Sequence, residues 1–129
     1  MTFIKMPLKD AVAPEALPEG PYTLILESVD KIEDPDGKTY LQIRHSVVGE
    51  PDAAAVFHRL NITLPEDPNK AKWSMLFCKA YLKAFGFPYE DDGWDDEEIV
   101  PGAQAQVFLE RSEYNGIVSN RIKLNIQDV

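Results

Sequence analysis

The sequence predicts a domain of the α+β class that is mainly β with one helix, in the order β-β-β-α-β-β. Three observations support this prediction. Several stretches alternate apolar and polar residues with the period of two that is typical of a half-buried strand. One central stretch places its apolar residues three and four positions apart, which is the helical period. Glycine, proline, asparagine and aspartate separate these stretches, as they do in turns.

The size and composition are those of one globular domain, with 129 residues, 44% hydrophobic and 27% charged. Residues 1–20 hold several prolines and little periodicity, so they predict an irregular N-terminal lead-in, and residues 21–129 predict the single domain. The one cysteine, Cys78, lies among apolar residues. It is expected to be a small buried side chain, because a single thiol cannot form an internal disulfide.

The N-terminus and the hydropathy pattern favour a cytoplasmic location. The first nine residues lack the apolar core of a signal peptide, and no window approaches the roughly 18 apolar residues of a membrane span. The single cysteine fits a reducing compartment.

Three strands are expected in the first half of the chain. "YTLILESV" alternates, with partial burial on both sides, and a second strand at 39–48 follows the turn-forming stretch Asp34–Gly37, so the two form a hairpin. The third strand lies within "VFHRLNITLP" and ends at Pro65, where proline removes a donor from the strand ladder.

A helix is expected from about Lys70 to Phe85, and Gly86 and Pro88 then supply its stop. Its expected apolar stripe consists of Trp73, Leu76, Phe77, Ala80, Tyr81 and Ala84. Later in the chain the period returns to two in "AQAQVFLE". Asn115 and Gly116 then predict the type I′ turn of a closing hairpin, so two strands follow the helix.

This order of elements is that of an OB-fold, a five-stranded, partly open Greek-key barrel whose middle strands and loops bind oligonucleotides or oligosaccharides. Other small α+β folds accept the same order. In the expected barrel the helix covers one end, and ten apolar residues fill the interior: Leu24, Leu26, Leu41, Ile43, Leu60, Ile62, Val107, Leu109, Ile122 and Leu124.

Polar, basic and aromatic side chains share the outer face of the second, third and fifth expected strands. Sequence-tolerant binding of single-stranded nucleic acid needs cations along the backbone path and flat side chains on which bases stack. The candidate DNA-binding residues are Tyr40, Gln42, Arg44, Phe57, Arg59, Asn61, Arg121 and Lys123, with Lys31 and Lys38 from the first turn region. In the alternative interpretation the aromatic residues are half-buried sheet residues and the basic residues only confer solubility.

The net charge of −9 is unusual for a protein that contacts phosphates. Much of the negative charge is concentrated in three places along the sequence: residues 33–36, residues 66–67 and residues 90–98. The expected binding strands are comparatively basic, so the total charge does not exclude nucleic acid.

The acidic stretch 90–98, "EDDGWDDEE", has three interpretations. In the first, it is a solvated loop whose Trp94 packs against the barrel. In the second, it is a mobile segment that mimics DNA and covers the binding face when DNA is absent, or that recruits a replication partner. In the third, it is a calcium site. The spacing lacks the ligand order of an EF-hand, which disfavours the third interpretation.

No catalytic pattern is evident, so the protein is not expected to be an enzyme and no cofactor is expected. The sequence contains no phosphate-binding "GxxxxGK" and no "HExxH". His45 and His58 are expected to be separated by strand parity and by a turn, with His58 as a hydrogen-bonded core histidine.

Four segments, spanning roughly residues 17–126, form an ordered pattern: "LPEGPYTLILESVDKIEDPDGKTYLQIRHSVVGE", "HRLNITLP", "LKAFGFP" and "PGAQAQVFLERSEYNGIVSNRIKL". This pattern resembles a family of small phage and prophage proteins related to single-stranded-DNA-binding proteins. In that family an "LPEGxY" opening leads the first strand, a helix ends near "Gly-Phe", and a closing hairpin carries "Asn-Arg-Ile".

The resemblance implies an OB-fold protein that coats single-stranded DNA in phage DNA replication, recombination or repair, in the host cytoplasm. Phage binders of this kind often recruit partners through an acidic C-terminal tail, and this sequence ends in "IQDV" without one. Replication or recombination proteins and a second copy in a homodimer are further candidate partners, and no membrane is expected. The competing interpretation is a non-enzymatic virion or replisome adaptor that binds a protein through the same face.

Overall fold

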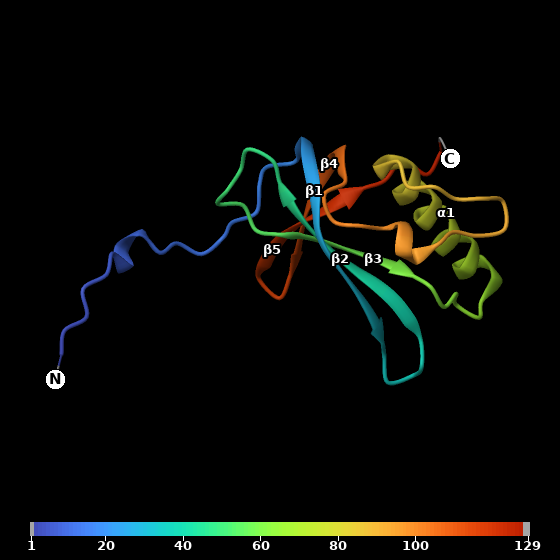
Figure 1. The fold of residues 1–129 in the computed structure, drawn as a ribbon, viewed down its shortest axis with the longest axis horizontal. Helices are drawn as coiled ribbons and strands as arrows, with labels where there is room; N and C mark the ends of the chain where they lie inside the picture. The colour runs from blue at the N-terminus through green and yellow to red at the C-terminus, as the bar shows by residue number, and fades with distance from the viewer. Residues whose placement is uncertain (1, 128–129) are drawn as a thin grey trace.

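The computed structural model describes residues 2–127 and is mainly β with one helix (Figure 1). The expected segments 1–20 and 21–129, and the end of "IQDV", reach residues 1 and 128–129, which lie outside the described residues. The elements are η1 (Leu8–Asp10), β1 (Gly20–Glu33), β2 (Thr39–Val47), β3 (Val56–Asn61), α1 (Pro68–Phe85), η2 (Asp96–Glu98), β4 (Gln104–Tyr114) and β5 (Ile117–Lys123). The predicted α+β class and the predicted order of strands and helix are confirmed.

The five strands form one antiparallel sheet in the order β3-β2-β1-β4-β5. β1 is 14 residues long and pairs with β4 through its first part and with β2 through the rest. A shift in register between Leu26 and Ser28 marks a bulge, which bends the strand. The edge strands β3 and β5 approach each other, but no described strand pairing joins them, so the sheet is curled and not closed.

The core lies on the inner face of this curled sheet and is covered by α1. Eight of the ten predicted barrel residues are buried, and Leu124 is partly buried against them. Ile62 is the exception because β3 ends at Asn61, and beyond that residue the side chain is exposed. The predicted strand end at Pro65 was therefore four residues too late.

The limits of α1 follow from its caps. The Asp67 carboxylate accepts hydrogen bonds from the backbone N–H groups of Asn69 (2.8 Å) and Lys70 (3.3 Å), and Pro68 occupies the first turn. At the other end Gly86 adopts φ 72°, the left-handed conformation that closes a helix.

The predicted apolar stripe of the helix was wrong at three of its six residues. Trp73 and Phe77 are 52% and 44% exposed, and Ala84 is exposed as well. The buried helix residues are Cys78, Ala80, Tyr81, Leu82 and Phe85. Only the C-terminal half of α1 is packed into the core, so the contacting stripe is rotated relative to the predicted one. Cys78 is buried as expected, and burial raises the pKa of its thiol to about 11.

Two histidines contact the Tyr81 side chain in the core. His45 Nδ1 lies 2.8 Å from the Val56 carbonyl oxygen, and its Nε2 lies 2.7 Å from the Tyr81 hydroxyl. His58 stacks on the same ring, with centroids 4.7 Å apart, and its buried Nε2 has no hydrogen-bond partner among the described residues. Desolvation, with a smaller contribution from His45, lowers the pKa of His58 to about 4.

The expected separation of the two histidines was therefore wrong. The β2–β3 register pairs Ile43 with His58 and His45 with Val56, which places both imidazoles on the inner face. His45, rather than His58, is the hydrogen-bonded core histidine.

Within residues 2–20, the lead-in is anchored at its C-terminal end, where it approaches β1. Asn120 of β5 accepts a hydrogen bond from the Leu17 N–H (2.7 Å) and donates one to the Leu17 carbonyl (2.9 Å), and Glu15 forms a bridge with Ala53. From there the chain extends away from the sheet, on the side opposite α1 (Figure 1). Within residues 2–127, no helix combines the length and the apolar content that crossing a bilayer requires.

Candidate nucleic-acid interface

Six of the ten predicted site residues share one face of the β2–β3 hairpin. Residues directly opposite each other in an antiparallel pair lie on the same side of the sheet. The opposed pairs are Tyr40 with Asn61, Gln42 with Arg59, and Arg44 with Phe57. All six side chains are exposed or half-buried, whereas the residues between them point into the core. The sequence pattern and the register thus place two arginines and two aromatic rings on adjacent positions.

Arg59 is held in place by its neighbours on this face. Its guanidinium lies 3.7 Å from the centre of the Tyr40 ring, and its Nε donates a hydrogen bond to Asn61 Oδ1 (2.9 Å). Asn61 in turn donates to the Ser74 hydroxyl of α1 (3.2 Å). A planar cation is therefore preorganised over Tyr40, and one face of that ring is covered.

Phe57 is the open aromatic residue of the face. Its side chain is 50% exposed, and it contributes nothing to the buried cluster. The interpretation of Phe57 as an ordinary half-buried sheet residue is compatible with this exposure, but a core role is not. An exposed ring beside Arg44 is available for stacking.

β1 extends the face by one more column. Ser28 lies opposite Arg44, Asp30 opposite Gln42, and Ile32 opposite Tyr40. Asp30 therefore places one carboxylate on this face, diagonal to Arg44 and two strands from Arg59, which reduces the positive charge of the face without cancelling it.

Arg121 and Lys123 of β5 are brought to the same region across a groove. This groove, of about 570 Å³, runs between β3, β5 and α1, and its walls include Arg59 and Asn61 on one side and both β5 cations on the other. Arg121 Nε forms an ion pair with Glu110 Oε2 (3.2 Å). Lys123 Nζ lies 5.7 Å from the centre of the Phe108 ring. Eight predicted residues thus form two adjoining groups that share Arg59 and Asn61.

The structure does not bring Lys31 and Lys38 into these groups. Lys31 lies opposite Leu41, on the side of the sheet facing away from Tyr40, and its Nζ pairs with Asp96 Oδ2 at 3.1 Å. Lys38 lies in the β1–β2 turn, where its backbone N–H donates to the Asp34 carboxylate (2.9 Å). Lys38 is exposed at the tip of the hairpin.

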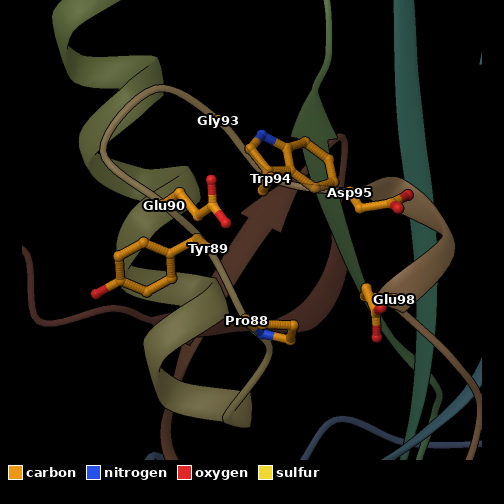
Figure 2. Close-up of a pocket in the computed structure, with 7 residues that line it drawn as sticks. All are labelled: Pro88, Tyr89, Glu90, Gly93, Trp94, Asp95 and Glu98. Carbon is orange, nitrogen blue, oxygen red and sulfur yellow. The ribbon is translucent and has the colours of Figure 1, made fainter.

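The acidic stretch 90–98 forms a hollowed loop beside α1. Trp94 packs partly buried against the core, as the first of the three interpretations expected. Glu90, Trp94 and Asp95 line a hollow of about 430 Å³. In the view of Figure 2, Glu90 and Asp95 lie to the two sides of Trp94. Asp96 of this stretch pairs with Lys31, which lies outside the β2–β3 face, so this contact does not place the acidic stretch over that face. Residues 2–127 contain no group of three potential metal-ligating side chains with the geometry to hold an ion.

Two exposed aromatic residues of β4 were not among the predicted site residues. Phe108 of β4 lies opposite Lys123, and Tyr114 stands 80% exposed at the β4–β5 turn. Phe108 occupies an outward position in its alternating strand, and Tyr114 precedes the Asn-Gly turn, so both signals were present in the sequence.

The candidate interface therefore combines exposed aromatic rings, amide groups and cations on two adjoining surfaces of one curled sheet. No protein-family model matches the chain, and neither does any curated protein sequence.

Proposed function

We propose that the protein binds single-stranded DNA across the outer face of β2 and β3, with little dependence on base sequence. The observation that carries this proposal is the register that sets Arg44 beside Phe57 and Arg59 over Tyr40. Cations that follow the backbone and aromatic faces that accept any base are the two components of sequence-tolerant binding.

The curled sheet supports the further proposal of an OB-type barrel. β1 pairs on both sides, the helix lies between β3 and β4, and the edge strands β3 and β5 approach each other. In an OB-fold, the middle strands and the loops joining strands one and two and strands four and five contact the ligand. Those loops correspond here to the turns carrying Lys38 and Tyr114.

A path for the single-stranded DNA follows from this arrangement. Bases stack on Phe57 and on the Arg59 guanidinium, whose planar surface already lies over Tyr40. Phosphates are neutralised by Arg44 at one end, by the N–H edge of Arg59 in the middle and by the β5 cations across the groove at the other end. The groove at β5 thus continues the β2–β3 face.

The process that this activity serves is proposed from the resemblance to phage and prophage proteins. The protein would coat single-stranded DNA during phage DNA replication, recombination or repair, as a non-enzymatic binder in the host cytoplasm. Replication or recombination proteins are its proposed additional partners.

Charge variants test the proposed path. Arg44→Ala, Arg59→Ala and Lys123→Ala should each weaken binding to labelled oligo-dT. Each should also reduce the slope of log K against log salt by roughly 0.7, the value per phosphate contact on a single strand. Lys72→Ala, which removes an exposed cation of α1 outside the face, is the matched control. Slopes unchanged in all three variants would exclude the path.

A protein-binding adaptor is the second candidate, and the net charge of −9 favours it. An adaptor using the same face would retain partner binding without measurable affinity for oligo-dT. The same titration separates the two functions, because DNA binding must weaken as salt rises.

A further inference from the structure

The N-terminal arm, residues 2–12, exposes a series of large apolar side chains. Phe3 is 90% exposed, and Ile4, Met6, Leu8 and Val12 are exposed as well. Folded monomers rarely leave so many neighbouring apolar side chains in water without a binding role. The arm also carries Lys5 and Lys9 against the single carboxylate of Asp10, so it combines apolar groups with a net positive charge.

A groove that is apolar inside and negatively charged at its rim lies at the far side of the domain from the arm. This Trp94 groove, of about 360 Å³, lies between α1, the chain after β3 and the acidic loop. Its apolar lining consists of Ile62, Leu64, Met75, Leu82, Tyr89 and Trp94. Its volume falls within the range of about 300–1,000 Å³ that is usual for ligand pockets.

The rim of the Trp94 groove is acidic. Glu90, Asp91 and Asp92 stand along it, and all three are exposed. One cation, Lys79, also lines the groove and lies 5.9 Å from the centre of the Tyr89 ring. The rim is therefore net negative, complementary to the arm.

The arm is directed away from the groove of its own chain. Its base is held by Asn120, which makes two hydrogen bonds to the backbone of Leu17, and by the bridge from Glu15 to Ala53. From this anchor the arm leaves on the side opposite α1 (Figure 1). A groove presented by another molecule is better placed to receive it.

We propose that the arm of one copy docks in the Trp94 groove of a second copy. The apolar side chains of residues 3–8 enter the groove, and Lys5 and Lys9 approach the carboxylates of Asp91 and Asp92. Because one patch meets a different patch, the contact produces either an arm-exchanged dimer or a head-to-tail chain. Of the six residues of the β2–β3 face, the groove includes only Asn61. Asp91, Asp92 and the arm lie outside that face, so changes at these positions test self-association separately from DNA binding.

Sedimentation of the full chain over a concentration series tests the proposal. The unmodified protein should associate. The double variant Phe3→Ser with Ile4→Ser, in which both changed residues are exposed, should remain monomeric. Ile117→Ser, at an equally exposed apolar position on the β4–β5 turn, should associate normally. A monomer at every concentration, or an unchanged association constant in the arm variant, would overturn the proposal.

A charge exchange identifies the partner surface. Lys5→Glu with Lys9→Glu, or Asp91→Lys with Asp92→Lys, should each weaken self-association on the order of tenfold, about 1.4 kcal/mol. Mixing the two variants should restore association between unlike copies, since the new charges are again opposite. No restoration in the mixture would assign the arm to a different surface and contradict the proposal. All four positions are exposed, and equal melting temperatures would verify that folding is intact.

Discussion

Phe57 offers the sharpest test of base stacking. Its ring is half exposed on the outer face of β3, so Phe57→Leu retains apolar bulk and removes only the flat π-surface. A stacked base is worth roughly 1–3 kcal/mol, and at about 1.4 kcal/mol per factor of ten the variant should bind oligo-dT about 5- to 150-fold more weakly. Its thermal stability should change little, because volume-conserving apolar exchanges cost less than about 1.5 kcal/mol even in a core. Fluorescence anisotropy and thermal melting on the same preparations measure both quantities.

Trp73→Leu provides the matched control. Trp73 is an aromatic residue of similar exposure, 52%, but it belongs to α1 and is neither on the β2–β3 face nor among the residues that line the β5 groove. Its replacement should leave oligo-dT affinity unchanged. If Phe57→Leu melts normally and binds like the unmodified protein, the stacking role of Phe57 is refuted, and the adaptor function gains support.

Three further predictions concern the core and the arm anchor. The pKa of His58 is about 4 in the folded protein and 6.5 in the unfolded chain, so the unfolded chain binds more protons between these two pH values. The stability contributed by neutral His58 is therefore fully present well above pH 6.5, and it falls by about 2 kcal/mol when the pH reaches 5. Melting at both pH values should show a smaller loss for His58→Phe than for the unmodified protein; an equal loss would exclude His58. Asn120→Ala should lower the free energy of unfolding by about 1–3 kcal/mol, because the Leu17 N–H and carbonyl lose their partner, whereas exposed Ser119→Ala should not. Cys78 should resist a thiol reagent until the protein unfolds, because its pKa is about 11 and it is buried; rapid labelling of the folded protein would contradict that assignment.

The strand faces were predictable from local pattern. Alternation in residues 39–47 and 56–61 separates core residues such as Leu41 and Leu60 from outward residues such as Arg44 and Phe57. Once the hairpin register aligns the two strands, the outward residues become neighbours without any further information. The six residues of the β2–β3 face follow from that period together with the hairpin register.

Features that depend on distant contacts were not predictable in the same way. The face of α1 that meets the core depends on how the helix sits against β3 and β4, so Trp73 was wrongly expected to be buried. Lys31 pairs with Asp96, 65 residues away, through a loop whose course no local pattern encodes. Periodicity assigns a residue to a face but does not identify the elements that cover that face.

Titration of labelled oligo-dT with the unmodified protein at two salt concentrations tests the central claim most directly. The proposed interface predicts saturable binding at low salt that weakens as salt rises, because cations on the β2–β3 face and in the β5 groove displace counterions from phosphates. Unlabelled oligo-dT should displace the labelled strand. The absence of binding at low salt, or an affinity that does not change with salt, would contradict the account.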